Sequence, residues 1–97
     1  MYARVVRWEG GDADAIRGTV DQIKADAPSG PPEGVPAKGL LLLADPEGGR
    51  ALAVALFETE EDRAKGHETL EGTSPPGDGM GTRSPAEMYQ VGVDLRV

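Results

Sequence analysis

Cysteine and asparagine are absent from this chain of 97 residues, and its aromatic residues are limited to one Trp, two Tyr and one Phe. The lack of cysteine excludes disulfides, thiolate nucleophiles and thiolate metal sites, and it suits a reducing compartment. The net charge of −7 excludes the basic surface that nucleic-acid binding needs, and an anionic membrane would repel it. No segment is apolar for long enough to span a bilayer or to act as a signal peptide, so the sequence predicts a cytoplasmic protein. The length fits one domain, which we expect to comprise residues 1–97.

The most informative stretch is a pair of apolar runs, Lys38–Ala44 and Ala51–Phe57, joined by a turn of Pro, Gly and acidic residues. Pro46 presets one turn dihedral, and Gly48 and Gly49 permit positive φ, which is typical of β-hairpins. Neither run alternates between apolar and polar residues, although successive residues of a strand point to opposite faces of a sheet. Both faces of the predicted hairpin must therefore be covered.

Two helices are predicted, each preceded by a capping residue. Asp12 can cap the first, and Thr59 can cap the second, which runs from Glu60 to about Leu70. Gly18 within the first helix costs about 1 kcal/mol relative to alanine, so that helix must gain its stability by docking on a sheet. The apolar stripe of the first helix consists of Ile16, Val20, Ile23 and Ala27.

Strands are also predicted near both ends of the chain, over Tyr2–Glu9 and Glu87–Val97. The resulting order, βαββαβ, predicts an α+β, ferredoxin-like fold with one four-stranded antiparallel sheet and both helices on one face. Apolar residues alternate in the last predicted strand, which places on one face Tyr89, Val91, Val93, Leu95 and Val97.

The two helices leave the second face of this sheet uncovered, although the hairpin runs are apolar. Fourteen glycines and few aromatic residues also make a lean core for a chain of this size. We therefore predict a homodimer that packs sheet against sheet. A charge at Leu41 or Leu42 is expected to dissociate or unfold this dimer, and the run leaves open which leucine faces the partner.

The stretch Ala53–Asp62 is a strand that ends in an aromatic residue and leads into a helix start with a Thr cap and acidic residues. In this stretch and in its element order, the chain resembles an uncharacterised branch of the dimeric α+β barrel superfamily, close to the antibiotic-biosynthesis-monooxygenase-like proteins. The resemblance implies a pocket between sheet and helices. Members include cofactor-independent monooxygenases of aromatic polyketides and haem-degrading enzymes. The latter typically use an asparagine on the first strand and a histidine near the end of the second helix; this chain has no asparagine and His67 lies earlier, so the resemblance implies no cofactor.

His67, the only histidine, is the candidate for catalysis because histidine side chains exchange protons near neutral pH. Its spacing from Ala64 and Leu70 places it on or beside the sheet-facing side of the second helix. In that position it is either a general acid or base, or a boundary histidine hydrogen-bonded to backbone or water. A metal site needs several ligands, and one histidine among scattered carboxylates predicts none.

Aromatic side chains are the candidates for a ligand-binding pocket. Trp8 lies at a strand end and its indole N–H needs a partner, which favours a place in a pocket wall. Phe57 and Tyr89 either extend that pocket, which would then suit a flat apolar ligand, or pack in the core. Arg4 or Arg7 would hold an anionic oxygen of such a ligand.

The segment 72–85 is rich in glycine and proline and is long for a compact domain. Its glycines do not predict a phosphate-binding loop, because neither a helix start nor a lysine follows them. It is either a plain linker or a flap over the cavity, with Met80 as the apolar contact to the ligand and Arg83 as a charge.

Two functions are compatible with these features. The first is a homodimeric protein that binds a small apolar or aromatic molecule, with cofactor-independent oxygenase or related activity on an aromatic or polyketide-like compound. The alternative is a non-catalytic homodimeric interaction or regulatory protein. A cavity would favour the first function, and an exposed apolar patch without a cavity would favour the second.

Overall fold

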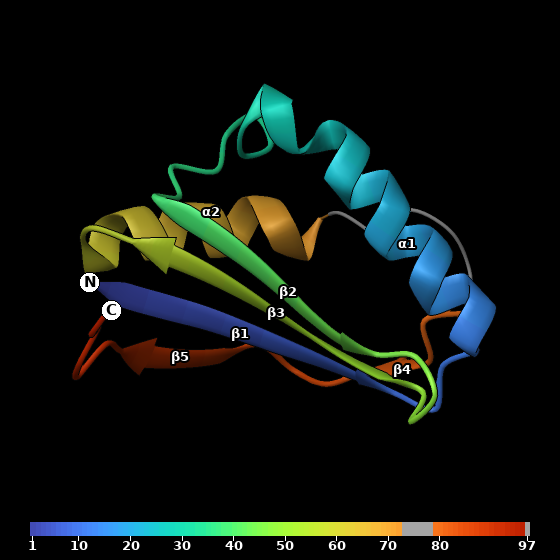
Figure 1. Cartoon of the computed structure of the whole chain (residues 1–97). Helices are drawn as coiled ribbons and strands as arrows, with labels where there is room; N and C mark the ends of the chain where they lie inside the picture. The colour runs from blue at the N-terminus through green and yellow to red at the C-terminus, as the bar shows by residue number, and fades with distance from the viewer. Residues whose placement is uncertain (73–78, 97) are drawn as a thin grey trace.

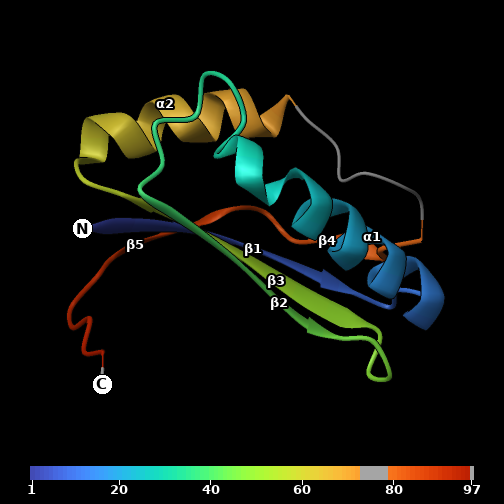
Figure 2. The same ribbon diagram turned by 45° about the horizontal axis from the view of Figure 1, so that its top comes forward.

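The chain forms one sheet with both helices packed against the same face (Figure 1). This computed structural model describes residues 1–72 and 79–96. The elements in chain order are β1 (Tyr2–Glu9), α1 (Ala13–Asp26), the 3-10 helix η1 (Ala27–Ser29), β2 (Gly39–Asp45), β3 (Arg50–Phe57), α2 (Glu60–Glu71), β4 (Thr82–Arg83) and β5 (Glu87–Gln90). Figure 2 shows from a second direction that α1 and α2 lie on the same side of the strands. None of the helices within the described ranges is long and apolar enough to cross a membrane.

The sheet has the order β2-β3-β1, and β4 and β5 both pair with the outer edge of β1. All of these pairings are antiparallel, so the predicted ferredoxin-like βαββαβ fold is confirmed. The predicted count of four strands is corrected to five, because a bulge divides the edge strand. Trp8 pairs with Arg83 but Val5 pairs with Glu87, so residues 84–86 face only two residues of β1.

The last strand is shorter than predicted. It ends at Gln90, and Val91 still donates its N–H to the carbonyl of Met1 at 2.9 Å. Beyond this bond residues 91–96 form no strand. The prediction of a strand over this stretch was therefore wrong, and Val97 lies outside the described residues.

Both predicted helix caps are confirmed. The carboxylate of Asp12 accepts the backbone N–H of Ala15 at 3.0 Å, and the hydroxyl of Thr59 accepts the backbone N–H of Asp62 at 3.0 Å. Each bond satisfies a donor that the helix itself leaves unpaired, and so fixes where the helix begins.

Two small clusters of buried side chains join the helices to the sheet. The helix α2 approaches the sheet closely at Gly66, where a β-carbon would lie 2.4 Å from the ring carbon Cε1 of Phe57. Phe57 is fully buried, so this helix position requires glycine. The first cluster contains Ile16, Ala51 and Met80 with Trp8 packed against it, and the second contains Val35, Ala55 and Phe57.

Glycines also allow three loops to meet at the end of β1. Gly11 donates its N–H to the carbonyl of Gly49 in the hairpin turn at 2.8 Å. Gly81 has φ +96°, and a β-carbon there would lie 2.1 Å from the carbonyl oxygen of Glu9. This close junction holds the neighbouring Met80 in the core, where it is 4% exposed.

Strand register assigns the leucines of β2 to faces of the sheet. Leu40 pairs with Ala55, and Ala55 pairs with Arg4, so these three side chains share the face that the helices cover, here called the helix face. Leu41 and Leu43 point to the opposite, open face, and they are 50% and 52% exposed.

Candidate functional site

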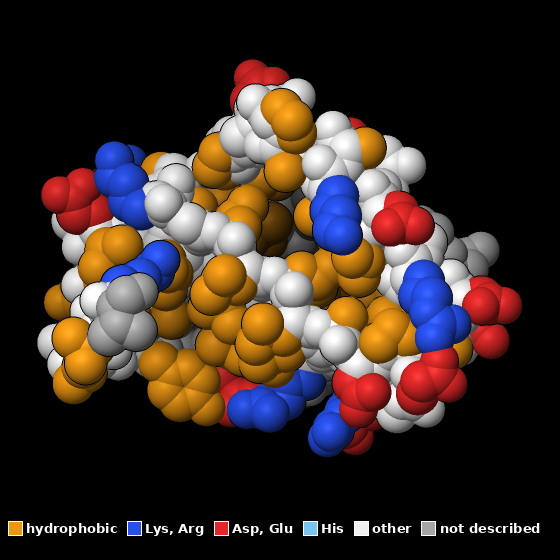
Figure 3. All heavy atoms as spheres, viewed as in Figure 1, with side chains coloured by type: hydrophobic (Ala, Val, Ile, Leu, Met, Phe, Trp, Pro, Cys, Tyr) orange, Lys and Arg blue, Asp and Glu red, His pale blue; other side chains and the backbone are white. Residues whose placement is uncertain are grey.

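A cavity of about 230 Å³ lies between the helix face and α1. Figure 3 shows this hollow between α1 and β2, with hydrophobic side chains lining it. The helix-facing residues of β3 include Ala53 and Ala55, whose small side chains leave space that larger residues of β1 and β2 enclose. The side chains of Thr19 and Ile23 on α1 lie across that space. The cavity therefore exists because the central strand presents alanine to the helices.

Apolar side chains from several elements form most of the cavity wall. Trp8 is partly buried there, and its indole N–H has no acceptor among the residues that the structure describes. The apolar residues of the wall are Val6, Trp8, Leu40, Leu42, Ile23, Leu70 and Met80, together with the alanines of β3. Leu41 and Val54 also border the cavity, although strand register places their side chains on the opposite face of the sheet.

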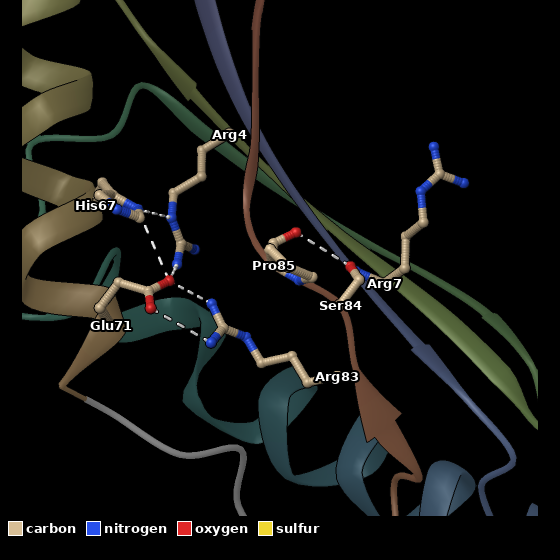
Figure 4. A network of polar contacts seen from close by, with 7 residues as sticks. All are labelled: Arg4, Arg7, His67, Glu71, Arg83, Ser84 and Pro85. Carbon is tan, nitrogen blue, oxygen red and sulfur yellow. Dashed lines mark hydrogen bonds and ion pairs between the residues drawn. The ribbon is translucent and has the colours of Figure 1, made fainter.

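One end of the cavity is cationic. Arg4 on β1 and Arg83 on β4 both line the cavity, and both bind the carboxylate of Glu71 at the end of α2 (Figure 4). Nη2 of Arg4 lies 2.7 Å from Oε1 of Glu71, while Arg83 donates from Nη1 and Nη2 to the two oxygens of that carboxylate. The side chain of Arg4 is only 7% exposed. Two guanidinium charges thus share one carboxylate charge, which leaves one positive charge in excess.

His67 lies one helical turn before Glu71 and orients Arg4. Its Nδ1 accepts the Nε–H of Arg4 at 2.9 Å, so the neutral ring carries its proton on Nε2. The same Nδ1 is 3.8 Å from Oε1 of Glu71, which is too far for a hydrogen bond. His67 is not among the residues that line the cavity. Its observed role is therefore to position an arginine that does line it.

The charges of this cluster persist at neutral pH. The hydrogen bond from Arg83, helped by the one from Arg4, lowers the pKa of Glu71 from its ordinary 4.5 to about 2, although desolvation opposes this. Burial lowers the pKa of Arg4, while its hydrogen bond to Glu71 acts in the opposite direction. An arginine so paired remains protonated, so the end of the cavity stays cationic.

The structure brings some predicted site residues together and separates others. Arg4, Trp8 and Met80 line the cavity. Phe57 does not reach it, because its ring is fully buried beneath α2. Tyr89 does not reach it either, because its register places it on the open face, where it is 47% exposed.

Arg7, the alternative to Arg4 as an anion-binding residue, also points to the open face. Its Nε donates to Oε1 of Glu87 at 2.8 Å, and the hydroxyl of Tyr89 donates to the other oxygen of that carboxylate at 2.5 Å. The odd residues of β1 face away from the helices, so Arg7 lies across the sheet from the cavity.

Glu71 is the residue of the cluster that sequence reasoning missed. The available signal was its position four residues after His67, which puts the two side chains on the same side of a helix. Nothing local indicated that Arg4 and Arg83 converge on it. Residues 73–78 of the predicted flap lie outside the described residues, whereas Met80 is fixed in the core.

No family model and no curated protein sequence matches this chain. Among solved structures, the chain is similar to a crystal structure of an arginine-to-serine mutant of MhuD with two manganese protoporphyrin IX bound per active site. The similarity covers 100% of both chains with a TM-score of 0.65 and 16% sequence identity, which establishes a common fold. The resemblance noted from the sequence is thereby confirmed at the level of the fold.

Proposed function

We propose that this protein binds a small, largely apolar molecule in the cavity between the helix face and α1. The observation that carries the proposal is the lining itself, because apolar walls surround a single cationic end. Binding sites for small molecules commonly combine apolar walls with a few polar groups that fix orientation. Trp8 supplies an aromatic surface and an N–H donor, and Arg4 supplies a buried charge.

The ligand of the structural neighbour, a porphyrin, supports a flat aromatic ligand but not one of that size. The cavity volume of about 230 Å³ lies below the range of about 300–1,000 Å³ that is usual for larger ligands. The residues present also do not suit a haem iron. His67 turns its Nδ1 to Arg4 and does not line the cavity, and Met80 is packed against Ile16 in the core. We therefore propose a ligand of a few rings or an equivalent chain.

The finer hypothesis is a cofactor-independent monooxygenase-like activity on an aromatic or polyketide-like compound. It rests on the shared fold and on the shape of the site, and no side chain of the cavity is assigned a catalytic step. Consumption of oxygen in the presence of a bound ligand would support this activity. Binding without any turnover would leave a binding protein.

A thermal-shift screen against polyketide-like aromatics, quinols, fatty acids, flavins and haem tests the binding proposal. A ligand at a hundred times its dissociation constant adds about 2.7 kcal/mol, which raises the melting temperature of a domain of this size by roughly 10 °C or more. Ile23→Trp should fill the cavity mouth and abolish the shift. Gln22→Trp, on the exposed side of the same helix, should leave it unchanged. A shift that survives Ile23→Trp would place the ligand elsewhere.

We further propose that the open face forms a homodimer interface. Leu41, Leu43 and Tyr89 are each about half exposed on this face, and apolar side chains gathered on one exposed face support a contact with another protein chain. Sedimentation at micromolar concentration should give the mass of two chains. The same face supports the alternative function of a non-catalytic interaction or regulatory protein. A screen in which no ligand shifts the melting temperature would favour this alternative.

A further inference from the structure

We infer that the ligand carries a carboxylate that binds between Arg4 and Arg83 at the cationic end of the cavity. This inference rests on the proposed function, and it assigns the chemical class of the ligand. The molecule would be an amphiphilic monoanion, with the carboxylate on the arginines and an apolar body along Val6, Leu42 and Ile23.

Both arginines of the cluster keep N–H donors for which the described residues offer no acceptor. A guanidinium group carries five N–H bonds. In Arg4, Nε binds His67 and Nη2 binds Glu71, while Nη1 has no acceptor among residues 1–72 and 79–96. In Arg83, Nη1 and Nη2 bind Glu71, while Nε has no acceptor within the same ranges. Arg4 lines the cavity and its side chain is only 7% exposed, so we expect a ligand in the cavity to meet its remaining donors.

The net charge of the cluster favours a ligand with a single negative charge. The two arginines and Glu71 sum to one positive charge in excess, and His67 is neutral in its contact with Arg4. One carboxylate would neutralise this cluster, whereas a phosphate monoester would bring a second negative charge next to Glu71. The planar fork of a guanidinium also matches a carboxylate in two parallel hydrogen bonds.

Glu71 holds both arginines in place and still leaves each of them with an N–H donor for a ligand. It draws Arg4 and Arg83 to one carboxylate, although they come from opposite ends of the chain. His67 fixes Arg4 from the other side. The arginine geometry is thus set before a ligand arrives, which reduces the entropy lost on binding.

The single tryptophan, Trp8, allows a direct test because it lies in the cavity wall. We would follow its fluorescence during titration with naphthoate and with decanoate, each compared with its neutral amide and with the matching phosphate ester. The wild-type protein should bind at least one acid about tenfold more tightly than its amide, since charged hydrogen bonds contribute this much. Comparison of naphthoate with decanoate shows whether the cavity prefers an aromatic acid or a fatty acid.

Arg83→Gln should weaken binding of the acid about tenfold and leave binding of the amide unchanged. Arg7→Gln removes an arginine that pairs with a carboxylate on the open face, and it should change neither affinity. Glu71→Gln should shift preference from the carboxylate towards the phosphate ester, because a second positive charge is then in excess. This readout separates charge recognition from a merely structural effect.

The outcomes separate this inference from the proposed function. Equal affinity of the wild-type protein for acid and amide would overturn the carboxylate site and leave the cavity as a binding site. Binding of the acid that is insensitive to Arg83→Gln would also overturn it. Absence of binding for every probe, charged or neutral, would overturn the proposed cavity function itself.

Discussion

The two faces of the sheet use the same strands for different purposes. On the helix face, small alanines of β3 lie below a cavity, and a buried arginine is held by residues of α2. On the open face, Leu41 and Leu43 are about half exposed, and the ion pair of Arg7 with Glu87 lies in contact with solvent. A period of two residues separates these environments along each strand.

This difference shows that neighbouring residues of one apolar run can have unrelated roles. The helix face combines apolar walls with charge, which suits a ligand that is fixed in one orientation. The open face exposes Leu41, Leu43 and Tyr89 beside an exposed ion pair, which suits contact with another protein. Substitutions that discriminate between the faces therefore test both assignments.

The largest expected effect comes from Gly66→Ala, which acts on the helix face. The added β-carbon would lie 2.4 Å from Cε1 and 2.5 Å from Cζ of Phe57, so α2 must move away from the sheet. We expect a loss of about 2–3 kcal/mol in the free energy of unfolding, despite the higher helix propensity of alanine. Urea denaturation measures this loss. A variant as stable as the wild type would show that α2 can shift at little cost.

A charge on each face gives the next largest effect. Leu42→Asp would place a carboxylate in the apolar cavity wall, and we expect it to cost about 2 kcal/mol of stability and to abolish ligand binding. Leu41→Asp would place the same charge on the open face. It should leave the monomer folded and able to bind the ligand, but convert the proposed dimer to monomers in sedimentation. If both variants behave alike, the assignment of the leucines to opposite faces is wrong.

Gly18→Ala should have a smaller effect, and of the opposite sign to Gly66→Ala. A β-carbon at Gly18 meets no heavy atom within 4 Å, so only helix propensity changes. We expect a gain of about 1 kcal/mol in the same urea experiment. A loss of stability would indicate that α1 has a close neighbour at this position, such as a partner chain.

The sequence was sufficient for the local structure and insufficient for the convergence of distant residues. Pro46 and the following glycines predicted the hairpin, and the caps at Asp12 and Thr59 predicted both helix starts. These signals involve residues a few positions apart. The end of β5 could not be predicted, because it depends on how this strand pairs with β1, more than eighty positions earlier in the chain.

The site shows the same limit. Arg4, Trp8 and Met80 were proposed as ligand-binding residues from separate signals, namely a positive charge, a strand-end aromatic and a long loop, and all three line the cavity. Phe57 and Tyr89 share the aromatic signal, but burial and register separate them from the cavity. Glu71 joins Arg4, which lies 67 positions before it, to Arg83, which lies 12 positions after it. Contacts over such separations leave no local pattern in the sequence.

The smallest effect should distinguish the two carboxylates that pair with arginine, Glu71 on the helix face and Glu87 on the open face. Each side chain is 39% exposed, but Glu71 pairs with the buried Arg4, whereas Arg7 opposite Glu87 is 51% exposed. Screening by salt is weaker for partly buried pairs. In urea denaturation, the destabilisation by Glu87→Gln should vanish near 1 M salt, while that by Glu71→Gln should persist.

The acid response sharpens the same comparison. The pKa of Glu71 is lowered from 4.5 to about 2 in the folded chain, so its charged form stabilises the fold. This contribution is complete above the unfolded value of 4.5 and is lost as the pH falls towards 2. The stability difference between the wild type and Glu71→Gln should therefore be constant from neutral pH down to about 5 and shrink at lower pH. A difference that is independent of pH down to about 2 would mean that the carboxylate charge contributes nothing, and that the arginines are held by packing alone.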